Sequence, residues 1–224
     1  MVRATVEKPT PPAPRMKWLL FVFLASGFAA LLYQVVWQRS LFAIFGINIE
    51  SVTVVVTAFM LGLGIGSIVG GFVSKDPKRS ALLLFGLVEL GIGAFGLVSL
   101  PLFHAVGKVT LELPALATAL ITFLLLLLPT MLMGGTLPLL VAHSVRTSGN
   151  VGKSVGQLYF VNTLGSAFAS ILSVMVMMGP LGQTNTVRVA AAINLVVGSS
   201  ALFLWSRERR MSAPSAPSKT AEAA

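Results

Sequence analysis

One acidic residue, Glu89, lies near the middle of an apolar stretch, Ser80–Phe103, that is long enough to cross a lipid bilayer. At 1.5 Å per helical residue, Glu89 is about 13 Å from the start of that stretch. A charged carboxylate at this depth costs on the order of 3 kcal/mol to insert, so we expect it to face the protein interior and to have a partner. Two interpretations are open: a site for a proton or small cation, or a neutral acid that only stabilises the fold.

Three amide side chains in other apolar stretches could belong to the same site. Gln34, Asn162 and Asn194 each need a hydrogen-bonding partner inside a helical bundle. That partner can be a neighbouring helix, in which case the amide holds helices together, or a bound solute. Both interpretations are open for all three residues.

A further apolar stretch, Leu113–Val141, contains Pro129 and Pro138. Proline removes a helix hydrogen bond and clashes with the preceding turn, so we expect this helix to kink or to open between the two prolines. Broken helices in transporters commonly form binding sites. The segment contains two glycines and two candidate site threonines: Gly134, Gly135, Thr130 and Thr136. A kinked helix without a binding role is the alternative.

Other apparent motifs do not predict chemistry. Gly91–Gly96 fits the G-x-G-x-x-G pattern of dinucleotide sites, but it lies in an apolar helix with no preceding strand. Gly152–Ser154 resembles the end of a phosphate-binding loop but lacks the upstream glycine. His104 and His143 have no acidic or histidine partner at metal-ligand spacing. We therefore expect no metal site, no cofactor and no catalytic site.

The acidic residues support that expectation, because only Glu89 lies within an apolar stretch. All seven are Glu7, Glu50, Asp76, Glu89, Glu112, Glu208 and Glu222. Paired carboxylates for acid–base catalysis are therefore not predicted.

The composition is that of a membrane protein. Hydrophobic residues make up 55% of the 224-residue chain, charged residues make up 10%, and the mean hydropathy is +0.89. The chain has no cysteine, which excludes disulfides and thiolate metal sites. The net charge of +9 could suggest nucleic-acid binding, but the positions of the basic residues favour another explanation.

Six apolar stretches are long enough to span a membrane as helices, and none alternates with the period of two expected of a strand. They are Trp18–Trp37, Val52–Val73, Ala81–Phe103, Leu113–Val141, Val155–Met178 and Val187–Trp205. We predict an all-α membrane protein with a basic, proline-rich, disordered arm at residues 1–17, a six-helix domain at 18–206 and a low-complexity tail at 207–224. The first stretch is too long for an ordinary signal peptide, so we expect it to be retained.

Basic residues predict the orientation, because cytoplasmic segments of membrane proteins are rich in Lys and Arg. With a cytoplasmic N-terminus, thirteen of the sixteen fall on the inner side. Only Arg39, Lys108 and Arg188 lie outside or at the outer helix ends. We expect both termini in the cytoplasm, basic segments in contact with anionic lipid, and no nucleic-acid binding.

Small residues repeat on one face of several stretches, which lets neighbouring helices approach closely. In the second stretch they are Gly62, Gly66 and Gly70. In the fifth they are Gly165, Ser166, Ala169 and Ser173 beside Asn162, and in the sixth Ala190, Gly198 and Ala201 beside Asn194. Gly62 and Ser67 are weakly repeated by Gly165 and Ser166, as an inverted repeat of three helices plus three would predict.

Five segments of the chain resemble, in the same order, the membrane portion of the fused major facilitator/spermidine synthase-like proteins of bacteria. They are Ser26–Arg39, Phe59–Ser67, Leu87–Gly93, Pro129–Pro138 and Val155–Gly165. The resemblance implies a major-facilitator-like six-helix unit. It also implies a soluble aminopropyltransferase-like domain that uses decarboxylated S-adenosylmethionine. The family often has Glu where this chain has Gln34, and we expect this chain to lack the soluble domain, because Met211–Ala224 has the composition of a linker or free end.

These observations predict a bacterial inner-membrane protein that is non-catalytic by itself. We expect it to serve as a membrane subunit, anchor or half-transporter for a synthase-like partner. One alternative is a homodimeric transporter of a small cationic solute such as a polyamine, with Glu89 as its intramembrane charge. A second is a membrane scaffold whose polar residues serve only helix packing.

Overall fold

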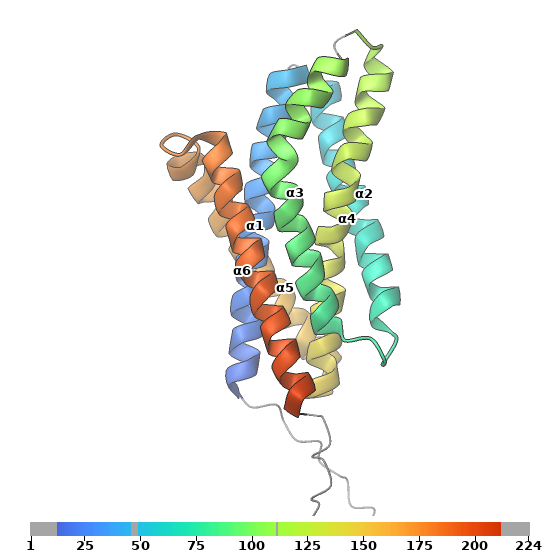
Figure 1. Cartoon of the computed structure of the whole chain (residues 1–224), viewed down its shortest axis with the longest axis vertical. Coiled ribbons are helices and arrows are strands. Elements are labelled where there is room, and N and C mark those ends of the chain that lie inside the picture. The colour runs from blue at the N-terminus through green and yellow to red at the C-terminus, as the bar shows by residue number, and fades with distance from the viewer. Residues whose placement is uncertain (1–12, 46–48, 111, 212–224) are drawn as a thin grey trace, which may run out of the picture.

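The computed structural model describes residues 13–45, 49–110 and 112–211, and nearly all of them are helical (Figure 1). The prediction of an all-α fold is confirmed. The elements are α1 (Ala13–Phe45), α2 (Ile49–Ser74), α3 (Ala81–Thr110), α4 (Ala115–Ser148), α5 (Val151–Leu172), a π-helical turn η1 (Ser173–Met177) and α6 (Gly182–Met211).

All six α-helices are long and apolar enough to cross a membrane, as predicted. Each of them extends beyond its apolar stretch at one end or both. α1 begins at Ala13 rather than Trp18, because Pro14 lies in the first turn, where a helix tolerates proline. α6 continues to Met211, and the basic residues in its last turn interact favourably with the helix dipole. Residues 1–12 of the predicted disordered arm and residues 212–224 of the predicted low-complexity tail lie outside the described residues.

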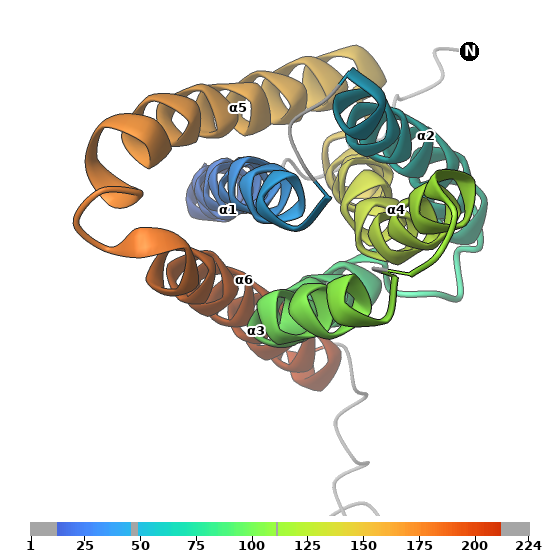
Figure 2. The same cartoon turned by 90° about the horizontal axis from the view of Figure 1, so that it is seen from above.

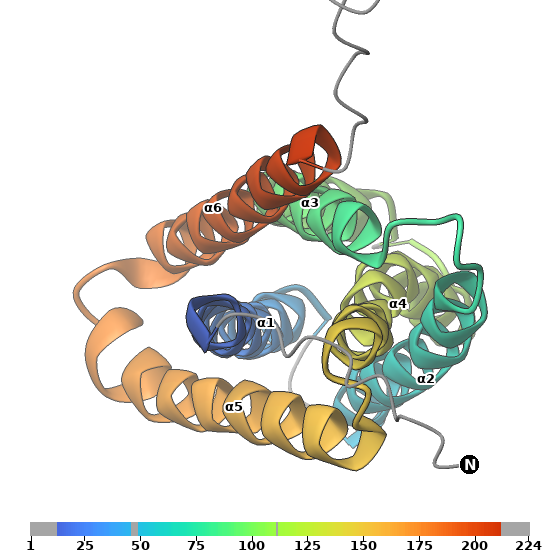
Figure 3. The same ribbon diagram turned by 90° about the horizontal axis from the view of Figure 1, so that it is seen from below.

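Helix α1 lies inside the bundle, between α5 on one side and α6 on the other (Figures 2 and 3). α2 packs mainly against α4, and α3 packs against both α6 and α4. Half of the most apolar segment of α1 is buried inside the bundle, compared with 17% of the corresponding segment of α5. α1 is therefore the central helix, and α5 presents most of its surface to the surroundings.

Helix α4 continues from Ala115 to Ser148 through both Pro129 and Pro138. The expectation was that this helix kinks or opens between its prolines. It does not open, and a kink stays a prediction. Neighbouring helices allow proline in a membrane helix when they cover the disturbed backbone. Here α2 covers it, since Gly70 lies against both Gly135 and Pro138.

The turn between α4 and α5 is formed by a glycine and an asparagine, two residue types that commonly end and begin helices. Gly149 has the left-handed backbone conformation (φ 72°), and its N–H donates to the Val145 carbonyl over 2.8 Å. The Asn150 side chain then accepts from the Lys153 backbone N–H over 2.9 Å, which caps the first turn of α5. Gly152–Ser154 is therefore part of a capped helix start.

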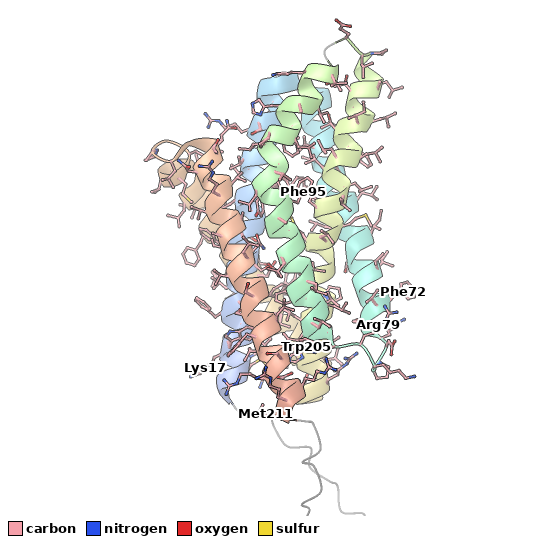
Figure 4. All side chains as sticks on the ribbon, viewed as in Figure 1. Lys17, Phe72, Arg79, Phe95, Trp205 and Met211 are labelled. Atoms are coloured by element: carbon pink, nitrogen blue, oxygen red, sulfur yellow. The ribbon has the colours of Figure 1, made fainter. Side chains whose placement is uncertain are left out.

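Basic residues gather at the end of the bundle where α1 begins and α6 ends, near Lys17, Arg79 and Met211 (Figure 4). The connections α2–α3 and α4–α5 lie at this end. Its described basic residues are Lys17, Lys75, Lys78, Arg79, Arg146, Lys153, Arg207, Arg209 and Arg210. Arg39, Lys108 and Arg188 belong to the opposite half, so the charge asymmetry read from the sequence is present in the folded chain.

Arg146 on α4 holds the α2–α3 connection at the basic end. Its guanidinium donates to the backbone carbonyl oxygens of Ser74, Asp76 and Arg79 over 2.6, 3.0 and 2.9 Å. Ser74 ends α2, so one of these bonds satisfies a carbonyl that has no partner within the helix. Arg146 thus ties the end of α2 to α4 through charge-assisted hydrogen bonds.

Candidate intramembrane polar site

Glu89 is completely buried in α3, and two other helices supply its partners. Ser26 on α1 donates its hydroxyl to Glu89 Oε1 over 2.5 Å, and Asn194 Nδ2 on α6 donates to Glu89 Oε2 over 2.5 Å. Within residues 13–45, 49–110 and 112–211, no basic side chain pairs with this carboxylate. The prediction that Glu89 faces the interior with a partner is confirmed, and both partners are neutral.

An aromatic pair on α1, Tyr33 and Trp37, packs against α3 at Gly96 and Ser99, about two to three turns from Glu89. Trp37 stacks on Tyr33, with ring centroids 4.8 Å apart, and its Nε1–H donates to Ser99 Oγ over 3.0 Å. The buried Tyr33 hydroxyl lies against Gly96 and has no hydrogen-bond partner in the described structure.

A small pocket of about 70 Å³ lies next to the partners of Glu89. Its polar lining consists of Ser26, Thr136, Asn162 and Asn194, and its apolar lining consists of Ala30, Leu63, Ile92 and Met133. These residues come from all six helices. Leu63 is 41% exposed, so the α2 wall of the pocket lies at the surface of the bundle. The pocket is the place where all six helices converge on one polar centre.

The structure brings together four of the six polar residues predicted from the sequence. Thr136, Asn162 and Asn194 line the pocket, and Glu89 lies behind Ser26 and Asn194. Gln34 is half-buried on α1 and does not line the pocket. Thr130 donates to the carbonyl oxygens of its own helix, with the nearest at 2.7 Å, and packs against α2. These last two residues are not part of the site.

Ser26 was not predicted as a site residue. It lies within the resemblance segment of the first stretch, and no role was predicted for it. One feature of the sequence does indicate it. Ser26 is eight residues from the start of its stretch at Trp18, and Glu89 is nine from Ser80. α1 and α3 run in the same direction, so the two side chains enter the membrane to similar depths.

The predicted packing glycines bring α2 and α4 together beside this pocket. A methyl group at Gly62 would overlap the Thr130 hydroxyl, and one at Gly66 would overlap the Met131 carbonyl oxygen. Gly134 is equally close to the Leu63 carbonyl oxygen. These glycines therefore allow backbone contact between α2 and α4, which places Leu63 and Thr136 on the pocket wall.

No protein-family model and no solved structure matches this chain. Among curated proteins, the chain is similar to a polyamine aminopropyltransferase from Oceanobacillus iheyensis, with 22% identity over 192 residues. The match covers 84% of this chain, so it extends over the transmembrane helices. It covers 36% of the relative, so this chain spans about a third of the length of the curated protein that it matches.

This comparison corrects the expectation that the protein is not an enzyme. That expectation was based on the absence of a catalytic pattern and of a soluble domain in the sequence. The relative is an enzyme by name, a polyamine aminopropyltransferase, and the similarity extends over most of this chain. The reasoning was wrong because membrane-spanning helices of an enzyme need not contain its catalytic residues. Their sequence therefore does not test for an enzymatic role.

Proposed function

We propose that this chain is the membrane-spanning unit of an aminopropyltransferase-type enzyme. It would anchor the aminopropyl-transfer reaction of polyamine synthesis at a membrane. The observation that carries the proposal is the similarity to a polyamine aminopropyltransferase over 84% of a chain that consists mainly of six transmembrane helices. The sequence motifs that resemble fused spermidine synthase-like proteins support the same assignment. The enzyme class implies an aminopropyl donor such as decarboxylated S-adenosylmethionine and an amine acceptor.

Affinity purification tests this proposal. The tagged chain is expressed in its native host, extracted from membranes in mild detergent and purified. The eluate is then assayed for aminopropyl transfer from decarboxylated S-adenosylmethionine to 1,4-diaminobutane. We expect activity in this eluate and none in the eluate of an equally tagged, unrelated six-helix membrane protein. Activity confined to the soluble fraction, with none bound to the tagged chain, would contradict the proposal.

The helix packing supports a further part of the proposal, a major-facilitator-like inverted repeat that relates α1–α3 to α4–α6. Such a repeat exchanges α1 with α4, α2 with α5 and α3 with α6. The α2–α4 contact then has α1–α5 as its counterpart, and α3–α4 has α1–α6. All four of these helix pairs pack along much of their length. The α3–α6 pair, which also packs extensively, is its own counterpart in such a repeat.

Two glycines on equivalent helices make equivalent backbone contacts. A methyl group at Gly27 on α1 would overlap the carbonyl oxygen of Asn162 on α5. A methyl group at Gly134 on α4 would overlap the carbonyl oxygen of Leu63 on α2. If the repeat pairs Gly27 with Gly134, it also pairs Asn162 with Leu63, and both of these latter residues line the pocket.

A second pair of contacts has the same register. Gly165 on α5 lies against the carbonyl oxygen of Leu24 on α1, and Gly66 on α2 lies against that of Met131 on α4. The three-residue spacing is the same in all four helices: Leu24 and Gly27, Met131 and Gly134, Leu63 and Gly66, Asn162 and Gly165. In transporters with such repeats, binding sites lie near the membrane midplane at the repeat interface. The pocket therefore favours solute binding as a second function of the same unit.

For the location we propose a bacterial inner membrane with both termini in the cytoplasm, supported by the basic residues at one end of the bundle. Reporter fusions after Lys78 and after Arg210 are expected to report the cytoplasmic side. A fusion after Lys108 is expected to report the opposite side. A cytoplasmic reading for the Lys108 fusion would be incompatible with six spanning helices in this orientation.

A further inference from the structure

We propose that the pocket beside Glu89 binds one primary alkylammonium group, such as the end of a polyamine. This inference builds on the proposed function, because it names the chemical class of a ligand for the same membrane unit. It is argued from the hydrogen bonds of the four polar side chains that line the pocket. In each of them one donor is already engaged within the protein and an oxygen keeps free lone pairs.

Glu89 engages the donors of two of these side chains. Ser26 gives its hydroxyl hydrogen to Glu89 Oε1, which leaves Ser26 Oγ with its lone pairs. Asn194 Nδ2 donates to Glu89 Oε2, and Asn194 Oδ1 is buried without a hydrogen-bond partner in the described structure. Asn194 is only 1% exposed, so leaving this oxygen unpaired costs free energy. The buried carboxylate thus takes the only donor of Ser26 and one of the two N–H donors of Asn194, and an oxygen of each side chain keeps free lone pairs.

The other two polar side chains are also acceptors. Asn162 Nδ2 donates to the Phe23 carbonyl oxygen over 3.3 Å, which leaves its side-chain oxygen available. Thr136 Oγ1 donates to the Met133 carbonyl oxygen over 2.7 Å, so its lone pairs are available as well. Four side-chain oxygens with free lone pairs suit a ligand that only donates hydrogen bonds, and an ammonium group has three donors and no acceptor.

The charge and shape of the pocket agree with this ligand. Glu89 is a buried acid without a basic partner in the part of the chain that the structure describes, and a bound ammonium would supply the missing counter-charge. The pocket of about 70 Å³ has more room than one water molecule needs. Its remaining wall is apolar, formed by Ala30, Leu63, Ile92 and Met133, and suits the methylene groups of an alkylamine.

Equilibrium binding to the purified full chain in lipid nanodiscs tests this inference. The probes are 1,4-diaminobutane, 1-butylamine and 1-butanol, measured by isothermal titration calorimetry. We expect 1,4-diaminobutane to bind and 1-butylamine to compete with it, whereas 1-butanol, which lacks the charge, does not compete. Glu89→Gln keeps the size of the side chain but removes its charge, and we expect it to weaken amine binding by at least about tenfold.

Two further variants separate binding from folding. Ser99→Ala removes a buried polar group from the same helix but outside the pocket, and we expect unchanged amine affinity. Ala30→Leu fills the pocket and leaves the hydrogen bonds of Glu89 intact, so we expect it to lose amine binding. Melting temperatures in the same nanodiscs identify any variant that has unfolded. If the Glu89→Gln protein unfolds, the amine affinity of the Ala30→Leu protein decides whether the pocket is the binding site.

Several outcomes would overturn the inference. These are equal amine affinity in wild type and Glu89→Gln, equal competition by 1-butanol, displacement of the amine by sodium but not by choline at the same ionic strength, or no amine binding by the folded wild type. The last result would indicate a pocket that holds only water. None of these outcomes affects the proposed function, because aminopropyl transfer by the purified protein tests that function separately.

Discussion

Gly66→Ala will lower the free energy of unfolding by about 1–3 kcal/mol, as expected for added volume in a closely packed contact. The new methyl group would overlap the carbonyl oxygen of Met131, and the backbone of α4 cannot move away as a flexible side chain could. α2 and α4 would have to separate, which disturbs the pocket wall at Leu63. Denaturant titration in mild detergent, followed by tryptophan fluorescence, measures the effect.

Two glycines on the same helix provide matched controls for Gly66. A methyl group at Gly64 or at Gly71 would meet no atom within 4 Å. Gly64→Ala and Gly71→Ala are therefore expected to leave stability unchanged or to raise it by up to about 1 kcal/mol through better helix propensity. If the repeat relates Gly66 to Gly165, Gly165→Ala will be as destabilising as Gly66→Ala. Equal stability of the Gly64 and Gly66 variants would contradict the close α2–α4 contact.

Glu89→Leu will destabilise the bundle more than Glu89→Gln. Leucine cannot accept hydrogen bonds, so the Ser26 hydroxyl and Asn194 Nδ2 would both be buried without their partner. Each unsatisfied group costs about 1–3 kcal/mol. Glutamine retains an oxygen for Ser26, and its amide can donate to Asn194 Oδ1 if the Asn194 amide rotates, so its effect on stability is smaller.

The same denaturant titration separates the two Glu89 variants. A Glu89→Leu protein as stable as wild type would show that Ser26 and Asn194 find other partners. It would also show that Glu89 has no role in holding α1, α3 and α6 together. Ser99→Ala serves as the reference for losing one buried hydrogen-bonding group on α3 without changing the acid.

The six helices and the burial of Glu89 could be predicted because each depends on a local property. Long apolar stretches favour helices that span a membrane, whatever lies next to them. An acid within such a stretch must face inward because lipid cannot solvate it. The identity of its partners could not be predicted. That Ser26 and Asn194 meet Glu89 depends on how α1, α3 and α6 pack, and no local pattern specifies this.

The prolines of α4 show a limit of local reasoning. Pro129 and Pro138 predict a disturbed helix when α4 is considered alone. In the bundle, α2 packs over the same segment through Gly62, Gly66 and Gly70, and α4 stays continuous. The glycine pattern and the proline pattern were both visible in the sequence. Only the fold shows that they face each other.

Thr130 and Thr136 illustrate the same limit for the site itself. Both were candidates because they lie between the two prolines. Thr136 lines the pocket, whereas Thr130 faces α2 and bonds to carbonyl oxygens of its own helix. Their separation by six residues places them on different faces of the helix, and only the position of α2 shows which face is the pocket wall.

The most direct test of the central claim, that six helices build an acceptor-lined cation pocket around Glu89, is an experimental structure with 1,4-diaminobutane. The protein is prepared in lipid nanodiscs with a saturating concentration of the diamine. We predict density for an amine among Ser26, Asn162 and Asn194, with Glu89 directly behind it. A pocket without amine density, or a Glu89 carboxylate paired with a basic side chain of the protein, would contradict the account.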